Sequence, residues 1–162
     1  MDKQELVYQP YEEGQEKDIS DMIWDVFSEF EAPEYSEKGV EIFRNFINPQ
    51  RLADDVKHNG FKIYCCYEGD ILAGVLALRN TKHISLLFVR KSHHKKGIAR
   101  ELVNIIIEYI KMSNPYAKEI TVNSSPYAVE IYKKLGFTAT DIMQEKDGII
   151  YMAMSKSIER GN

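Results

Sequence analysis

The 162-residue sequence has few of the features that mark several large classes of protein. Its only two cysteines, Cys65 and Cys66, are adjacent. Neighbouring residues of a strand point to opposite faces, so this pair excludes a framework of disulfide bonds. No apolar run approaches the roughly 20 residues that a membrane-spanning helix needs. We therefore expect no membrane partner.

The chain also shows no internal repeat, no low-complexity tract and no linker, so we expect one domain over residues 1–162. Its first ten residues, MDKQELVYQP, are polar and lack the apolar segment of a secretory signal. We therefore expect a cytoplasmic protein. The formal net charge of −4 argues against a protein dedicated to binding nucleic acid.

The apolar residues that are present change their spacing along the chain. Spacings of three and four residues predict a helix over 19–30 and a second helix that Ser36 caps and that ends near 48–50. Strand patterns cover 6–8, 61–67, 71–79, 83–90 and 119–124. Residues 97–112 again follow the helical spacing.

The last third of the chain predicts a short helix over 126–135 and two strands, 137–143 and 149–155, around a turn. Ser125 is placed as the N-cap of that helix, Pro126 as its first residue, and Gly136 just beyond its end. The order β-αα-βββ-α-β-α-ββ predicts a mixed α/β domain, a sheet of about seven strands flanked by helices. The strand–helix–strand crossover at 83–124 implies one parallel pair.

A basic stretch, FVRKSHHKKGIARELV (88–103), lies between a predicted strand and a predicted helix. Gly97 and Ala99 fall at the start of this helix, where small residues let a ligand approach the backbone. Free amides and the helix dipole form an anion site there, to which Lys95, Lys96 and Arg100 add charge. A phosphate or pyrophosphate would suit this site, although a solvated basic loop has the same composition.

The stretch resembles the acyl-CoA-binding motif of the GNAT superfamily of N-acetyltransferases, Gln/Arg-x-x-Gly-x-Gly/Ala, with a strand-ending valine before it. His94–Ala99 follows this pattern after Val89, but His94 stands where the family has Gln or Arg. Residues 123–137 resemble the family's Asn-x-x-Ala-x-x-x-Tyr-x-x-x-Gly-Phe. Ala128, Tyr132, Gly136 and Phe137 match, whereas Ser125 replaces the Asn.

The resemblance implies the GNAT fold over the whole chain. It implies transfer of an acetyl group from acetyl-CoA, as co-substrate, to a primary amine of a small molecule or a protein, by direct attack in a ternary complex. A non-catalytic acyl-CoA-binding or sensor module of the same fold is the alternative, and a homodimer is possible. The residues implied to bind acetyl-CoA are Leu87, Phe88, Val89, His94, Lys95, Lys96, Gly97, Ile98, Ala99, Arg100, Asn123, Ser125, Ala128 and Tyr132.

Two residues are candidates for catalysis. In the family the tyrosine that matches Tyr132 donates a proton to the CoA sulfur, and a phenol with a pKa of about 10 can do so when it is pre-oriented. His83 occupies a strand position where some members carry a catalytic Glu or His, and a neutral imidazole can accept a proton at pH 7. A core tyrosine and a bystander histidine are the alternatives. A bulge between His83 and Val89 would decide which face His83 occupies.

The acceptor amine is expected to bind near Phe27, Glu31, Tyr35 and His83, although Phe27 also fits the core. Glu34, Asp141 and Glu145 are rival acids. The glutamates at 29, 31, 34 and 37 favour a cationic amine. No metal is expected, because adjacent histidines such as His93 and His94 rarely share one ion.

Overall fold

The computed structural model describes residues 5–160. Its helices are α1 (Glu16–Phe30), α2 (Glu37–Phe46), α3 (Pro49–His58), α4 (Ile98–Ser113) and α5 (Val129–Lys134), with 3₁₀ turns η1 (Ala32–Glu34) and η2 (Lys91–His93). Its strands are β1 (Leu6–Pro10), β2 (Lys62–Glu68), β3 (Ile71–Arg79), β4 (His83–Val89), β5 (Glu119–Ser124), β6 (Thr138–Ala139), β7 (Gln144–Lys146) and β8 (Ile149–Ser157). No helix of the described residues is long and apolar enough to cross a bilayer.

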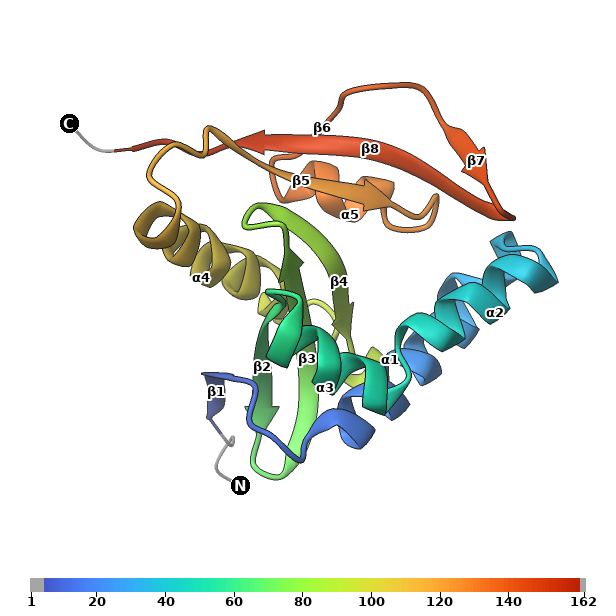
Figure 1. Cartoon of the computed structure of the whole chain (residues 1–162), viewed down its shortest axis with the longest axis horizontal. Coiled ribbons are helices and arrows are strands. Elements are labelled where there is room, and N and C mark those ends of the chain that lie inside the picture. The colour runs from blue at the N-terminus through green and yellow to red at the C-terminus, as the bar shows by residue number, and fades with distance from the viewer. Residues whose placement is uncertain (1–4, 161–162) are drawn as a thin grey trace.

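The eight strands form one mixed sheet in the order β1-β2-β3-β4-β5-β8-β6, with β7 paired to β8 (Figure 1). Helices α1 and α3 cover one face of β2–β4, and α4 covers the other. Each face has its own apolar core. Cys65 belongs to the core under α1 and Cys66 to the core under α4, as the alternation along a strand predicts.

The parallel pair that the crossover predicts is confirmed, but it is short. Strands β4 and β5 pair only at His83 with Thr121 and at Ile84 with Val122. Beyond these residues the two strands diverge, as Figure 1 shows, and the sheet opens into two arms. One arm contains β1–β4, and the other contains β5–β8.

A bulge at Ser85 interrupts the pairing of β4 with β3. Ile84 pairs with Leu78 and Leu86 with Ala77, so Ser85 is the extra residue of β4. Ile84 therefore packs in the core under α4, whereas Leu86 and Phe88 pack in the core under α1. A regular strand would have put all three on one face. The question left open by the sequence is therefore answered: a bulge lies between His83 and Val89 and puts these two residues on opposite faces.

Three sequence predictions need correction. Helix α3 was not expected, although Asn48 caps it and Pro49 is its first residue, the usual pair of start signals. Helix α5 begins at Val129, three residues later than predicted, because Ser125 caps a preceding turn through the Ala128 N–H (3.2 Å). The predicted strand 137–143 shrinks to the two residues of β6, and β7 forms inside the predicted turn.

Candidate active site

Two cavities meet where β4 and β5 diverge. The α4 cavity, of about 420 Å³, lies beside the start of α4 and α5. The α2 cavity, of about 290 Å³, lies beside α2 and the free part of β5. Both are lined by the same five residues at their junction, namely Glu31, Leu87, Phe88, Ala128 and Tyr132. A molecule in one cavity would therefore reach a molecule in the other at this junction.

Most of the residues predicted to bind acetyl-CoA line the α4 cavity. They come from the end of β4, the basic loop, the first turn of α4 and α5: Leu87, Phe88, Val89, His94, Lys95, Gly97, Ile98, Ala99, Arg100, Ala128 and Tyr132. Lys96 does not line it, and Asn123 and Ser125 line the α2 cavity instead. Sequence reasoning missed six further residues that line the α4 cavity, namely Val26, His93, Tyr127, Ile131, Lys134 and Leu135.

The backbone at the start of α4 is shaped to receive an anion. Gly97 is the N-cap residue with a left-handed φ of 79°, and Lys95 is also left-handed with a φ of 64°. A Cβ at Gly97 would meet no atom within 4 Å. No side chain caps the helix, so its first-turn N–H groups keep their capacity to bind a ligand. This open cradle can hold a phosphate or pyrophosphate group.

Side chains of the basic loop, residues 90–97, line the cavity and also fix the loop in place through hydrogen bonds. His94 stands at the position where the motif departs from the family pattern, and its Nε2 hydrogen bonds to the Val89 carbonyl (2.8 Å). His93 is buried and contacts Glu68 (3.2 Å) and Ser92 (2.8 Å). Arg100 donates to the Lys134 carbonyl (3.0 Å). The histidine bonds join the loop to β4 and β2, and the Arg100 bond joins the first turn of α4 to the end of α5.

The free edge of β4 supplies further backbone donors. The Arg90 N–H donates to the Ala73 carbonyl (2.7 Å), so Phe88 is the next residue whose N–H and C=O face β3. Leu87 and Val89 therefore turn theirs toward the gap that β5 leaves. The Val89 carbonyl is bonded to the His94 ring. Leu87 lies at the junction of the cavities and Val89 lines the α4 cavity, so their N–H groups are placed to meet a ligand there.

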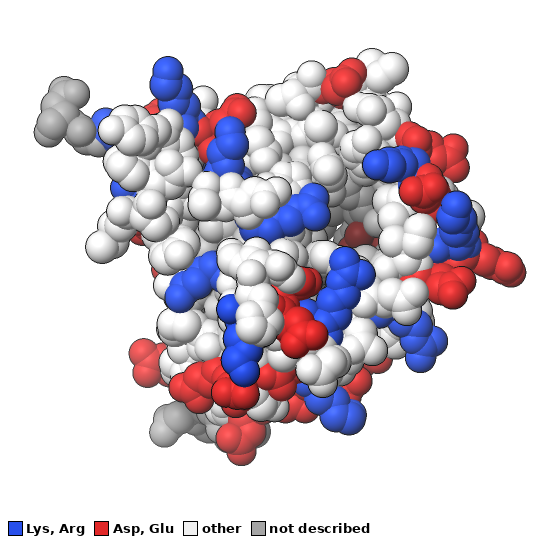
Figure 2. Space-filling view, viewed as in Figure 1, with Lys and Arg blue, Asp and Glu red and all other residues white. Residues whose placement is uncertain are grey.

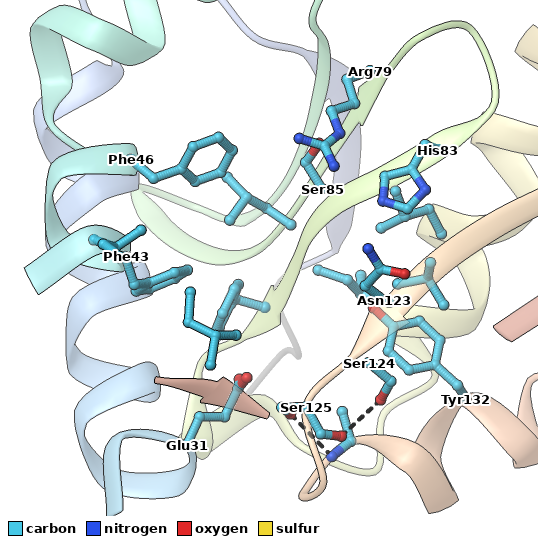
Figure 3. A pocket seen from close by; sticks show the side chains of 18 of the residues that line it. Glu31, Phe43, Phe46, Arg79, His83, Ser85, Asn123, Ser124, Ser125 and Tyr132 are labelled. Carbon is cyan, nitrogen blue, oxygen red and sulfur yellow. Dashed lines mark hydrogen bonds between the residues drawn. The ribbon is translucent and has the colours of Figure 1, made fainter. Parts of the chain in front are cut away.

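The α2 cavity brings together side chains that are far apart in the sequence. Figure 3 shows Glu31 at one end of it, Arg79 and Ser85 at the other, and Asn123 and Tyr132 between them. Aromatic and aliphatic side chains of α2 and β8 complete the wall, among them Ile42, Phe43, Phe46 and Ile149. Tyr35 and His83 also line this cavity, as predicted for the acceptor pocket. Phe27 does not, because it is fully buried in the core and stacked on Phe43 (4.0 Å).

Tyr132 is buried and extends from α5 into the junction (Figure 3). Its ring makes an edge contact with Phe137 at 5.3 Å. Burial raises the pKa of its phenol far above the ordinary value of 10, and the charge of Glu31 adds to this. The group is therefore protonated at any pH near neutrality, and it can donate a hydrogen bond into either cavity.

His83 lies in the α2 cavity, at the end where β4 and β5 still pair. Burial lowers the pKa of its imidazole to about 4, and the positive charge of Arg79 contributes to the shift. Its Nδ1 shares a hydrogen bond with the Thr121 hydroxyl (2.8 Å). The ring is therefore neutral at pH 7, but it is a weak base.

Glu31 is the acid with the most perturbed pKa in the site. Burial raises the pKa of its carboxyl to about 7, the nearby charge of Glu34 adds to the shift, and the Ser125 hydroxyl opposes it. Glu31 ends α1 as its C-cap residue, and this position directs its side chain into the junction, as Figure 3 shows. A carboxyl that titrates near 7 can exchange a proton at physiological pH.

The other acids considered for this site are engaged elsewhere. Glu29 pairs with Lys91 (2.9 Å), and Glu34 accepts from the Tyr127 N–H (3.1 Å). Asp141 accepts from Ile142 and Gln144. Neither cavity is lined by any of these three or by Glu145. In residues 5–160, no three His, Cys, Asp or Glu side chains cluster as metal ligands would.

Residues 31–158 match the family described as "Acetyltransferase (GNAT) domain". A search of the curated proteins found no match. The fold is similar to solved structures that share little sequence with this chain.

A GCN5-related N-acetyltransferase from Rhodopseudomonas palustris superposes with a TM-score of 0.80 at 19% identity, over 97% of this chain and 98% of that one. The PaiA N-acetyltransferase from Thermoplasma acidophilum, solved with coenzyme A, gives 0.77 at 14% identity, over 94% and 99%. A spermidine N-acetyltransferase chimera from Vibrio cholerae and hSSAT gives 0.62 at 17% identity, over 94% and 95%. At these identities the likeness shows the fold.

Proposed function

The chain belongs to the GNAT acetyltransferase family, and we propose that it transfers an acetyl group from acetyl-CoA to a primary amine in a ternary complex. The observation that carries this proposal is the meeting of two cavities at Glu31 and Tyr132. One cavity ends on the open cradle at Gly97, and the other is closed by α2. Acetyl-CoA supplies the acetyl group as an activated thioester.

The α4 cavity is the proposed site of acetyl-CoA. The first-turn amides of α4 and the left-handed Gly97 would hold the pyrophosphate, and Lys95, Lys96 and Arg100 would add positive charge around it. The free N–H groups of Leu87 and Val89 would pair with the pantetheine arm and stabilise the charge that develops on the acetyl oxygen.

The α2 cavity is the proposed site of the acceptor amine. A free alkylamine has a pKa of roughly 10, so a proton must leave before the nitrogen can attack. Glu31 is better matched to this task than His83, because its pKa of about 7 lies near the working pH whereas that of His83 is about 4. We therefore assign proton removal to Glu31, directly or through a water, and a packing role to His83.

Tyr132 is the proposed donor to the departing thiolate. Its phenol stays protonated because burial raises its pKa, and it lies at the junction that the sulfur would occupy. An acetyl-cysteine enzyme is disfavoured, because burial raises the pKa of Cys65 to about 12 and also raises that of Cys66. A thiol that stays protonated is a poor nucleophile.

The binding half of the proposal is tested with two matched glycine variants. Gly97 and Gly60 both have a left-handed φ, and a Cβ would meet open space at both, but only Gly97 lines the α4 cavity. Gly97→Ala and Gly60→Ala should therefore lose similar stability from backbone strain. Acetyl-CoA at about 100 times its Kd should raise the Tm of wild type and of Gly60→Ala by roughly 5–10 °C. Gly97→Ala should show little of this rise, and an equal rise in both variants would refute the cradle.

The chemical half is tested by the release of free thiol from acetyl-CoA with a panel of amines. Tyr132→Phe should lower kcat by roughly 100-fold or more and leave the acetyl-CoA-dependent Tm rise intact. Tyr116→Phe is the control, because Tyr116 is 89% exposed and lines neither cavity. Equal kcat values for the two variants would show that Tyr132 is a core residue without a role in the transfer.

A further inference from the structure

We infer that the acceptor of the proposed transfer carries a carboxylate as well as its amine, and that Arg79, Ser85 and Arg51 bind that carboxylate. This inference rests on the proposed function, whose acceptor site is the α2 cavity. It names the class of acceptor, an amino acid in the broad sense.

The far end of the α2 cavity holds two buried polar atoms that have no partner. They are the Nε of Arg79 and the hydroxyl of Ser85, and neither has a hydrogen-bond partner in the described chain. No carboxylate of residues 5–160 lies within 4 Å of the Arg79 guanidinium either. Buried polar atoms in proteins nearly always have a hydrogen-bond partner. Two such atoms without a partner in one cavity therefore point to a ligand that would bond to them.

Ser85 reaches the cavity because of the bulge in β4. As the extra residue of the strand, it has no partner on β3, and its side chain is turned out of the regular alternation. Figure 3 shows its hydroxyl beside Arg79 at the end of the cavity away from Glu31. Bulges commonly redirect a side chain at a functional site. Here the bulge places the Ser85 hydroxyl, a second hydrogen-bond donor, beside the Arg79 guanidinium.

Arg51 adds a second guanidinium to the lining of the α2 cavity. It lies in the first turn of α3, over the ring of Phe46 at 5.3 Å, and it lines the cavity. Within residues 5–160 its only contact with an acid is a long one of 3.8 Å from its Nε to Asp55, so its terminal nitrogens keep donors for a ligand. The planar fork of an arginine matches a carboxylate with two parallel hydrogen bonds.

The charges of the cavity disfavour an acceptor with more than one positive charge, although the acidic loop alone would favour one. Of the four glutamates at 29, 31, 34 and 37, only Glu31 lines the α2 cavity. The two arginines that line it would repel the second charge of a diamine or polyamine. Figure 2 shows a hollow between α2 and the β5–β8 arm with Lys or Arg side chains at its rim.

The two ends of the cavity fit the two ends of an amino acid. Arg79 lies opposite His83, where β4 and β5 still pair, whereas Ser125 and Glu31 lie at the other end. Ser125 follows Val122 by three residues, which is roughly 10 Å along an extended chain. Between the ends, Phe43, Phe46 and Ile149 form apolar walls. An amine at Glu31 and a carboxylate at Arg79 would be joined by an apolar spacer along these walls.

The test compares acceptors that differ only in the carboxylate. The panel holds 5-aminopentanoate, 6-aminohexanoate and lysine, in which a chain of methylene groups separates an amine from the carboxylate. Each is compared with the amine that lacks the carboxylate, namely butylamine, pentylamine and the diamine cadaverine. The readout is kcat/KM from thiol release. We expect at least one acid to exceed its carboxylate-free partner and cadaverine by roughly 10- to 100-fold. Equal or better transfer to the amines without a carboxylate overturns the inference.

Two cavity variants and one control locate the effect. Arg79→Gln and Ser85→Ala should lower kcat/KM for the preferred acid by roughly tenfold or more and leave that of its partner amine unchanged. Arg44→Gln is the control, because Arg44 stacks on Trp24 and lines neither cavity. Ser85→Ala only removes an unpartnered hydroxyl, so it serves if Arg79→Gln does not fold. Equal losses for acid and amine overturn the inference.

A separate binding measurement distinguishes failure of this inference from failure of the proposed function. The acetyl-CoA-dependent rise in Tm reports the α4 cavity alone. The further rise on adding 5-aminopentanoate or pentanoate to the coenzyme A complex reports the arginine end, without any transfer. A rise in wild type that Arg79→Gln abolishes supports the inference even if no acceptor is acetylated. A normal acetyl-CoA response with no response to any of these acids overturns it.

Discussion

At the scale of single residues, the most unusual group of the site is the Glu31 carboxyl, whose charged form is destabilised by burial. Glu31 is the C-cap residue of α1 and lines both cavities, where burial raises the pKa of its carboxyl to about 7. The same burial that would suit Glu31 for its proposed role in removing a proton also makes its charged form costly to the fold. Under that proposal, Glu31 serves function at the expense of stability.

This trade-off predicts opposite effects of Glu31→Gln on stability and rate. Folding raises the pKa of the carboxyl from 4.5 to about 7, so the folded state binds more protons than the unfolded state between these pH values. The wild-type protein therefore loses stability as pH rises through this window, and the variant does not. At about pH 8 the variant should be more stable by at most roughly 3 kcal/mol, and below about pH 4.5 the two should match.

Urea unfolding from pH 4 to 8 measures the stability, and thiol release measures kcat, which we expect to fall by roughly 100-fold or more. Glu29→Gln is the control, because Glu29 pairs with Lys91 on the surface and should change neither quantity. A Glu31→Gln protein that is less stable than wild type at pH 8 would contradict the assignment of a strained carboxylate.

At the scale of elements, short caps and irregularities position the site. Helix α3 begins where the Asn48 side chain accepts from the N–H groups of Gln50 (2.9 Å) and Arg51 (3.4 Å). This cap holds the turn from which Arg51 enters the α2 cavity. The bulge in β4 is a second local irregularity that positions the site, since the one extra residue, Ser85, lines the cavity.

Removing the cap should loosen this turn. We expect Asn48→Ala to lower the free energy of unfolding by about 1 kcal/mol, because two helical N–H groups lose their acceptor. Asn48→Asp keeps an acceptor oxygen and should remain close to wild type. Urea unfolding of the three proteins measures the difference, and equal losses in both variants would show that the amide nitrogen matters rather than the cap.

At the scale of the whole molecule, the two arms of the split sheet are joined across the α2 cavity. The turn between β7 and β8 rests on the start of α2, where the Ser36 N–H donates to the Gly148 carbonyl (3.1 Å). Gly39 allows this approach. A Cβ on it would lie 2.5 Å from the Gly148 carbonyl oxygen. The closure of the proposed acceptor site therefore depends on a contact between elements that are far apart in the chain.

Gly39→Ala tests this contact. An alanine inside a helix normally stabilises it by about 1 kcal/mol relative to glycine. Here the backbone of Gly148 would have to move, so we expect a lower Tm and a several-fold higher KM for the acceptor. The Tm rise with acetyl-CoA should be unchanged, because Gly39 and Gly148 line neither cavity and the α4 cavity lies elsewhere. A higher Tm with an unchanged KM would show that the turn is not held on α2.

Local patterns in the sequence were sufficient for most of the fold. Strand β3 and helix α2 follow from the spacing of apolar residues and from the Ser36 cap, which act over a few neighbouring residues. The two motifs around Gly97 and Tyr132 pointed to the family that residues 31–158 match. The short helix α3 was missed although its cap was readable, because only Leu52 and Asp55 of it are buried and its apolar stripe is short.

The site needed tertiary contacts for its chemistry. The sequence by itself determined a helix that starts near Gly97 and a short helix that carries Tyr132, since both depend on local backbone preferences. Only the tertiary structure decided that Glu31 would titrate near 7 and that Arg79 and Ser85 would face one cavity. Desolvation and the direction of a bulged side chain depend on segments distant in the chain, which no short stretch of sequence contains.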